Sequence, residues 1–502
     1  MTNQNGRSQK TTVWVRPLLL IIAALYLCAN LFASPNIPIF LEGDQTFFWV
    51  YAQRILHGER IYQDFFQFTP PGADLLYYVL FRIFGIHLWV TNLTVLCLGL
   101  ALSYLCFDLA SRFMKHSMAL LTSVIFLVLI YGSSLDATHH WFSILASLSA
   151  IRVLMSARTF PRIAGAGALL GLAMFFTQTN GVAASAAVLL ALVVEDISIQ
   201  NAWKLKMNRT AVLMTAISMT WCVLISHWIA IIGWRKLWYF EITYPVNFVR
   251  SNYLIPKLSG SLSDGAQRLL VYASMLLAYP GTLWYCWHRR RNLTGQEKIQ
   301  ATLLALTGLF LLLGVITKVS WIRLYIVSMP AIVVCMWAVA HTKKVRPFIV
   351  SVLWILIAIL ATRQTMSRHR HANTIVDLPA GTTALSELWA EKFVWIREHT
   401  HPGDLFLEAQ RINAYLPLQL HSPIFADGLL STEVTRPEYV ELAVRQVEQK
   451  RVHYILWSPQ LSATVKGNRE DQNNLGPFRS YLSTHYTRVH IFSNSEEVWQ
   501  RR

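Results

Sequence analysis

The chain has 502 residues, of which 54% are hydrophobic and only 14% are charged, and its mean hydropathy is +0.38. A water-soluble protein of this length carries about a quarter charged residues, so the composition excludes a soluble globular protein and indicates burial in lipid. The formal net charge of +17 lies entirely before Ser367, where basic residues cluster in short loops between apolar runs, a pattern that sets membrane orientation and excludes a nucleic-acid-binding face.

A membrane-spanning helix needs roughly 20 mostly apolar residues, and eleven such segments, some of them short, are predicted between the N-terminus and about Thr362. The first is expected to remain uncleaved, because Ser34-Pro35-Asn36 follows it in place of a signal-peptidase site. With the N-terminus in the cytoplasm, every loop rich in Lys and Arg falls on the cytoplasmic side. The predicted helices begin at Pro17, His87, Ser117, Trp141, Ile163, Gly181, Thr210, Gln267, Ile299, Trp321 and Pro347.

The first outer loop, residues 34–86, predicts two helices that lie along the membrane interface. Residues 45–56 form an amphipathic stretch, and a second apolar stretch follows Pro70-Pro71-Gly72 and ends at Phe84. Pro71 suits a helix N-terminus because its φ is already helical and its missing N–H would be unpaired there. We expect both helices to bury their apolar faces at the level of the lipid headgroups.

Two carboxylates in this loop are candidate catalytic residues. Asp44 directly precedes the amphipathic stretch, where a partly buried carboxylate can serve as a general base. The alternative for Asp44 is an N-cap that accepts hydrogen bonds from the next turn, and one carboxylate can perform both roles. Asp64 is flanked by aromatic residues in Tyr62-Gln63-Asp64-Phe65-Phe66 and can contact a sugar or a cation, or cap a turn.

Further polar residues are predicted at the outer ends of later helices. Asp136, His139 and His140 stand at the start of the fourth predicted helix, where they can ligate a divalent cation, hydrogen-bond a phosphate or simply mark a helix end at the headgroups. Lys318 and Arg323 flank the short outer turn between the ninth and tenth helices. Two cations there can clamp a lipid phosphate or act as snorkelling anchors.

Residues 367–502 alternate helical and extended patterns and predict a small α/β domain outside the cytoplasm. They contain no nucleotide-binding signature such as a phosphate-binding loop. The predicted fold class is therefore mainly α, with a polytopic membrane domain over residues 1–366 and an α/β domain over residues 367–502. Within the latter we expect helices over 385–399 and 436–451 and strands over 404–409, 452–457 and 488–492.

These features resemble the GT-C superfamily of polytopic glycosyltransferases, which includes protein mannosyltransferases and the aminoarabinose transferase that acts on lipid A. Many relatives have Asp-Glu where this chain has Asp44-Gln45, so any role of that Glu stays open here. The resemblance is carried by Gly43-Asp44-Gln45, residues 52–58, Tyr62-Gln63-Asp64, Pro70-Pro71-Gly72 and, in the segment 318–330, Arg323, Tyr325 and Pro330.

The resemblance implies an inverting sugar transfer from a polyprenyl-phosphate donor to a lipid, glycan or protein acceptor outside the cytoplasm. Asp44 would deprotonate the acceptor hydroxyl, Asp64 or Asp136 would assist or hold a cation, and Arg323 would bind the donor. Lys318, Tyr325 and the two histidines are the further substrate-binding candidates. No cofactor follows from the sequence, and a divalent cation stays an open alternative.

Two other functions fit a polytopic chain. A transporter or flippase of lipid-linked sugars commonly has broken helices and ionisable residues near the middle of the membrane. Here the centres of the apolar segments contain almost no Asp, Glu, Lys or Arg, and the polar candidates gather on the outer side. A structural anchor for the C-terminal domain would not need eleven helices or a carboxylate in an interface loop. Both observations favour the transferase.

Overall fold

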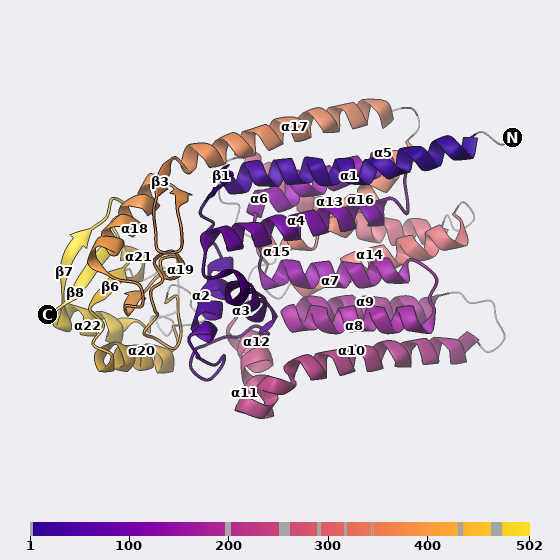
Figure 1. Ribbon diagram of the computed structural model, residues 1–502. Coiled ribbons are helices and arrows are strands. Elements are labelled where there is room, and N and C mark those ends of the chain that lie inside the picture. Colours follow the sequence, from indigo (N-terminus) through magenta and orange to yellow (C-terminus); the bar gives the residue numbers. More distant parts are fainter. Residues whose placement is uncertain are drawn as a thin grey trace. The chain divides into compact units, whose positions relative to one another are not determined.

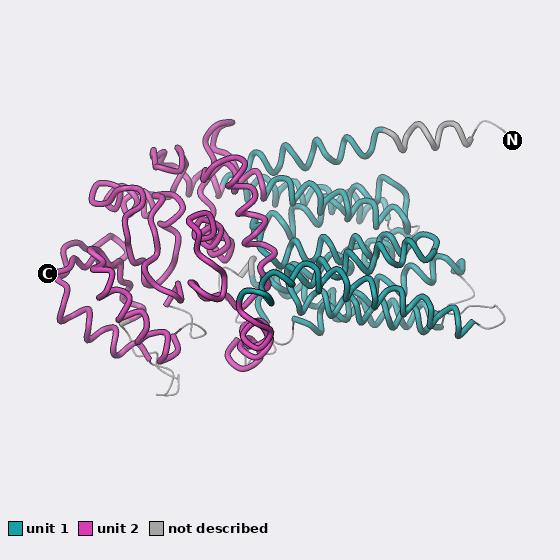
Figure 2. Tube along the Cα trace, turned by 60° about the horizontal axis from the view of Figure 1, so that its bottom comes forward, with its two compact units in different colours: residues 1–30, 95–231, 250–366 teal, residues 31–94, 232–249, 367–502 magenta. Residues whose placement is uncertain are grey.

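The computed structural model describes residues 4–195, 202–249, 262–288, 293–315, 319–342, 344, 346–429, 435–462 and 474–502, most of them helical (Figure 1). They separate into two compact units (Figure 2). Unit 1 comprises residues 1–30, 95–231 and 250–366, and unit 2 comprises residues 31–94, 232–249 and 367–502. Unit 2 thus combines the C-terminal residues with two segments that the sequence analysis grouped with the membrane part.

Unit 1 is built from apolar helices, and each of the eleven predicted segments contains a helix. Within the described residues, seven helical stretches are long and apolar enough to cross a membrane, and three shorter apolar helices accompany them. The multi-pass membrane fold is confirmed, whereas the count of eleven spans stays a prediction. The helices are α1 (Gln4–Leu31), α4 (Leu88–Ala110), α5 (His116–Ile125), α7 (His139–Leu154), α8 (Phe160–Phe176), α9 (Gln178–Val194), α10 (Ala202–Ile232), α13 (Leu262–His288), α14 (Gly295–Val315), α16 (Met329–His341) and α17 (Arg346–His371).

Two of the predicted helices are interrupted. A π-helical stretch, η1 (Phe126–Tyr131), lies between α5 and the short α6 (Gly132–Ser134). The tenth segment is divided into α15 (Trp321–Ile326) and α16, and Pro330 lies in the first turn of α16. In a continuous helix the Pro330 ring would clash with the carbonyl of Ile326, four residues earlier, which is where α15 ends.

The first outer loop in unit 2 contains the two predicted interface helices. They are α2 (Gln45–Leu56) and α3 (Gly72–Phe84), which pack against each other, and Pro71 immediately precedes α3 as expected. The short strands β1 (Phe32–Ser34) and β2 (Ile37–Pro38) precede α2. The second outer segment of this unit folds as α11 (Trp234–Trp238), the π-helical η2 (Tyr239–Thr243) and α12 (Tyr244–Phe248).

The C-terminal domain has a four-stranded mixed sheet in the order β5-β6-β8-β7. The strands are β5 (Phe406–Glu408), β6 (Tyr454–Trp457), β7 (Tyr486–Ile491) and β8 (Glu497–Arg501); β5 and β6 are parallel and the other pairs antiparallel. The predicted helices appear as α18 (Glu387–His399) and α20 (Pro437–Gln449), which confirms an α/β domain. Prediction missed β8, the hairpin of β3 (Thr374–Val376) and β4 (Thr383–Leu385), and α22 (Gly476–His485).

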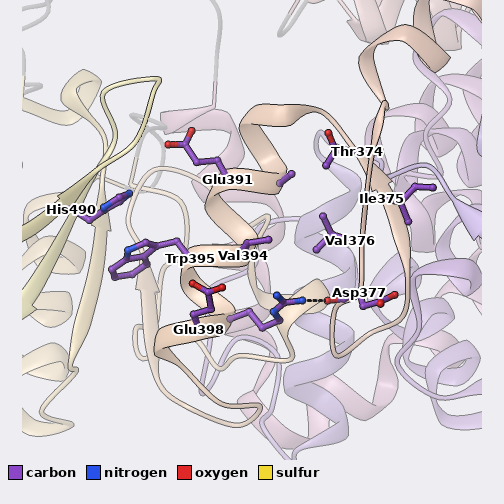
Figure 3. A pocket seen from close by; sticks show the side chains of 11 residues that line it. Thr374, Ile375, Val376, Asp377, Glu391, Val394, Trp395, Glu398 and His490 are labelled. Carbon is purple, nitrogen blue, oxygen red and sulfur yellow. Dashed lines mark hydrogen bonds between the residues drawn. The ribbon is translucent and has the colours of Figure 1, made fainter.

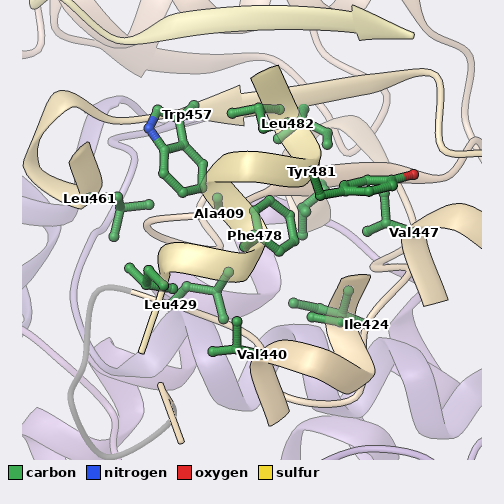
Figure 4. Packing of buried hydrophobic residues seen from close by; sticks show 14 of the residues in the cluster. Ala409, Ile424, Leu429, Val440, Val447, Trp457, Leu461, Phe478, Tyr481 and Leu482 are labelled. Carbon is green, nitrogen blue, oxygen red and sulfur yellow. The ribbon is translucent and has the colours of Figure 1, made fainter. Parts of the chain in front are cut away.

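One hydrophobic core holds the sheet and its helices together (Figure 4). Val440 and Val447 of α20 and Phe478 of α22 pack with Ile455 and Trp457 of β6, and all five are at most 2% exposed. The rings of Trp457 and Phe478 stack with their centroids 5.6 Å apart and an interplanar angle of 5°. Burying aromatic side chains of this size contributes several kcal/mol to the stability of the domain, so the core fixes the helices on the sheet.

Candidate active site

Asp44 directly precedes α2 and is exposed. The chain enters the helix through Gly43, whose φ of +101° is a conformation that glycine adopts without steric cost. The N-cap alternative is wrong, because the Asp44 carboxylate makes no capping hydrogen bond. The Thr46 hydroxyl instead donates to the Gly43 carbonyl at 2.8 Å, and the Gln45 amide donates to the Glu42 carbonyl at 3.1 Å. Toward the described residues, the Asp44 carboxylate is therefore available for an external ligand.

The segment that leads into Asp44 is attached to the C-terminal domain. The Phe40 amide donates to the Ala384 carbonyl at 3.0 Å, which extends the β3–β4 hairpin by one bridge. Two residues before Asp44, the Glu42 carboxylate accepts a hydrogen bond of 2.7 Å from the indole N–H of Trp389. Asp44 thus lies on a short turn that is held on both sides, by these contacts and by α2.

The other end of α2 is anchored by Arg54, whose side chain is only 6% exposed. Its Nη1 lies 2.9 Å from Oδ2 of Asp427 and 2.9 Å from the carbonyl oxygen of Ile424, and its Nη2 lies 2.7 Å from Oε2 of Glu59. The guanidinium also sits over the Phe65 ring, 4.9 Å from its centroid. A buried arginine with this many partners holds α2 in one orientation.

Asp64 is exposed and forms a local turn. Its Oδ2 accepts a hydrogen bond of 2.8 Å from the Arg60 amide, and its backbone carbonyl accepts one of 3.3 Å from Arg54. The turn-capping alternative is therefore confirmed. The exposed Asp64 side chain still allows a sugar contact, which stays a prediction.

Two buried acids in the outer loops were missed by the sequence analysis. Asp74, in the first turn of α3, is fully buried and accepts a hydrogen bond of 3.1 Å from Gln67. Glu241, in η2, is 4% exposed, and its Oε1 lies 2.9 Å from the Tyr62 hydroxyl. Burial raises the pKa of Asp74 well above its usual range and raises the pKa of Glu241 to about 7. Each is a single acid in an apolar or aromatic run, which is the signal that could have identified it.

Tyr62 joins these elements in an unusual backbone conformation. It is fully buried with φ of +66°, which is rare for a bulky residue. Its hydroxyl lies 2.8 Å from the Thr69 carbonyl as well as 2.9 Å from Glu241. One hydroxyl proton serves only one acceptor at a time, so the second hydrogen bond needs the carboxyl proton of Glu241. This arrangement agrees with the raised pKa of Glu241.

The remaining predicted residues belong to unit 1, and most of them come together there. Asp136, His139 and His140 are all buried, and the two imidazole rings lie 3.9 Å apart between centroids. The Thr138 hydroxyl donates to Asp136 at 3.3 Å. Helix α15, which carries Arg323, packs against α7 and η1, and the positive charge of Arg323 acts on His139.

Tyr325, also on α15, is 8% exposed, whereas Lys318 lies outside the described residues. Within the described ranges, no group of three or more His, Cys, Asp or Glu side chains is arranged to hold a metal ion. Asp136 and the two histidines therefore do not form a three-ligand set in this arrangement.

Comparison with known proteins identifies the fold. No protein-family model matches the chain, and no curated protein matches it either. Among solved structures, ArnT from Cupriavidus metallidurans bound to undecaprenyl phosphate is 13% identical, with a TM-score of 0.61 over 97% of this chain and 98% of that chain. The oligosaccharyltransferase AglB from Archaeoglobus fulgidus, in complex with an inhibitory peptide and a dolichol-phosphate, is 10% identical, with a TM-score of 0.52 over 98% of this chain and 74% of that chain.

Both neighbours are glycosyltransferases of the GT-C fold, so the fold that the sequence predicted by resemblance is confirmed. Coverage of nearly the whole ArnT chain means that the likeness includes the C-terminal domain as well as the membrane helices. At 10 to 13% identity the likeness concerns the fold. The activity is argued separately from the residues described above.

Proposed function

We propose that the protein is an integral-membrane glycosyltransferase that moves a sugar from a polyprenyl-phosphate donor to an acceptor hydroxyl outside the cytoplasm. The observation that carries the proposal is the exposed Asp44 carboxylate, which is held at the start of an interface helix in a chain with the GT-C fold. The likeness to structures that bind undecaprenyl phosphate and dolichol-phosphate supports the donor class. The apolar helices supply the lipid environment that such a donor needs.

The proposed reaction needs one base and one site for a phosphate. The acceptor oxygen attacks the anomeric carbon, the bond between that carbon and the phosphate oxygen breaks, and polyprenyl phosphate leaves with the bonding electrons. Asp44 takes the proton of the acceptor hydroxyl. Attack on the face opposite the phosphate inverts the configuration at the anomeric carbon. Asp64 or Asp136 assists by contacting the sugar or a cation.

The donor phosphate is proposed to bind beside Arg323. A guanidinium forms paired hydrogen bonds with phosphate oxygens and stabilises the charge that grows on the leaving group. His139 and His140 lie on α7, which packs against α15, the helix that carries Arg323 and Tyr325. Lys318 is the further proposed contact. No residue in this scheme requires a metal, and a divalent cation stays an alternative source of positive charge.

Orientation follows from the loop charges. The N-terminus is proposed to lie in the cytoplasm, and the first outer loop and C-terminal domain outside it, in the plasma (inner) membrane. Acceptor and base then meet on the side where the C-terminal domain lies. A lipid, glycan or protein can each supply the hydroxyl.

The direct test is transfer by the purified protein in detergent, supplied with polyprenyl-phosphate donors of several sugars and a mixture of cell-envelope acceptors. We expect release of polyprenyl phosphate and appearance of glycosylated acceptor, measured by mass spectrometry. If the purified protein transfers no sugar but moves intact donor across the bilayer of proteoliposomes, the transporter function is correct and the transferase function is wrong.

A further inference from the structure

A groove on the C-terminal domain lies between the hairpin strand β3 and one face of α18 (Figure 3). Its volume is about 650 Å³, within the range of about 300–1,000 Å³ that is usual for sites of small organic ligands. The groove is open to solvent along its length. All of its lining residues belong to unit 2.

The floor of the groove is aromatic and apolar. Trp395 stacks on His399, with centroids 3.9 Å apart and an interplanar angle of 11°, and on His490, with 5.2 Å and 19°. These two contacts hold the indole in one orientation. Val394 lies beside it on α18, and Ile375, which is 59% exposed, presents an aliphatic side chain from β3. An isoleucine that is this exposed contributes little to the packing of the domain core.

Carboxylates and a guanidinium surround this floor. Glu391 and Glu398 are spaced seven residues apart on α18 and therefore lie on one face of the helix. Glu391 is oriented by Ser493, whose hydroxyl donates to it at 2.6 Å. Arg397 donates to the Asp377 carbonyl at 2.6 Å. Toward the residues that the structure describes, Glu398 makes no hydrogen bond or ion pair.

These apolar and charged side chains together determine which ligands the groove can bind. Carboxylates accept hydrogen bonds from pairs of hydroxyls, and the indole N–H and guanidinium donate them. The aliphatic side chains of Ile375 and Val394 can cover the C–H face of a sugar ring. Three carboxylates against one guanidinium give the groove a net negative charge, which disfavours phosphates and other anions.

We propose that this groove binds a saccharide chain that carries neither phosphate nor carboxylate groups. The role that we assign to it, holding the glycan part of an acceptor, rests on the proposed function. The binding itself does not depend on that function. In this assignment Glu398 is the main hydrogen-bond acceptor for the sugar, and Ile375 and Val394 provide its apolar contact surface beside the stacked Trp395 ring.

The test measures binding of hexasaccharides to the full-length protein in detergent by titration calorimetry. The probes are neutral hexasaccharides of glucose, mannose and N-acetylglucosamine, and a galacturonate hexasaccharide as the anionic probe. We expect at least one neutral probe to bind and the anionic probe not to bind. Glu398→Gln should weaken that binding about tenfold, because a charged acceptor becomes a neutral one, and Ile375→Ser should weaken it through the apolar surface.

Glu441→Gln is the matched control, because Glu441 is an exposed carboxylate on α20 outside the groove. It should bind the neutral probe as the unchanged protein does. The inference is overturned if no neutral probe binds, if galacturonate binds equally well, or if Glu398→Gln and Glu441→Gln are indistinguishable. Binding of polyprenyl phosphate, the lipid part of the donor, measured on the same samples should be equal in all variants. If the unchanged protein does not bind polyprenyl phosphate, the proposed function is contradicted and the inference about the groove is unaffected.

Discussion

Arg54 and Asp427, which are 373 residues apart in the sequence, form a buried ion pair with Nη1 and Oδ2 at 2.9 Å. The pair joins α2 of the first outer loop to the C-terminal domain. The Ser422 hydroxyl also donates to Asp427, so the aspartate has a second polar partner besides Arg54. Through this pair the C-terminal domain holds the helix that follows Asp44.

Removing one partner of this pair should destabilise the protein strongly. Asp427→Asn leaves the Arg54 charge buried without its full counter-charge, and the expected loss is about 3 kcal/mol. Thermal unfolding of the purified protein, followed by tryptophan fluorescence, should show a lower midpoint. The double variant Arg54→Met with Asp427→Leu should lose less stability than the sum of the losses in Arg54→Met alone and Asp427→Leu alone. Equal midpoints for Asp427→Asn and the unchanged protein would show that the pair does not hold α2.

Gly43→Ala should lower transfer activity while leaving the membrane part folded. A side chain at φ of +101° is strained by about 1–3 kcal/mol, and the turn relieves this strain by moving Asp44. The measurement is the transfer rate at saturating donor. Gly165→Ala in α8 is the control, since that glycine has open space around it and needs no positive φ. Equal rates for both variants would mean that the backbone at Gly43 does not position Asp44.

Glu241→Gln should stabilise the protein at alkaline pH. Burial raises the pKa of Glu241 from 4.5 to about 7, so between these pH values the folded state binds more protons than the unfolded state. Stability therefore falls as pH rises from 4.5 to 7 and stays lowered above 7. At pH values above 7 the variant should exceed the unchanged protein by up to about 3 kcal/mol, and below 4.5 the two should be equal. Parallel unfolding midpoints across this pH range would contradict the raised pKa.

The proposed orientation predicts which surfaces an impermeant thiol reagent reaches in intact cells. Thr487→Cys in β7 is exposed on the C-terminal domain and should react from outside. Thr159→Cys, in the loop before α8, should react only after the membrane is permeabilised. The unchanged protein, which contains six cysteines, gives the background. Reaction in the reverse order would overturn the topology.

Local patterns in the sequence were sufficient to locate the eleven apolar segments and the pair α2 and α3. Apolar runs and amphipathic spacing report burial within a few turns, and Pro71 marked the start of α3. Pro330 indicates that the tenth segment is divided. The division was not predicted, because the segment reads as one continuous apolar run. The pairing of Arg54 with Asp427 leaves no local pattern, because it depends on how distant segments pack.

The site residues likewise divide into those that a local pattern identified and those that it missed. Asp44 was identified because it directly precedes an amphipathic stretch, and in the structure its carboxylate is exposed and makes no capping hydrogen bond. Asp74 and Glu241 were missed because a single acid in an apolar run resembles a membrane-interface residue until its burial is known. The burial of Glu241, for example, depends on the packing of residues 232–249 against the first outer loop, which neither segment shows by itself.

The most direct measurement is the transfer rate of purified Asp44→Asn with a polyprenyl-phosphate sugar donor, compared with Glu441→Gln, which removes an equally exposed carboxylate elsewhere. Loss of a general base lowers the rate about a hundredfold to ten-thousandfold, and donor binding should be unchanged. If Asp44→Asn transfers sugar as fast as Glu441→Gln, then Asp44 is not the base and the central claim is wrong.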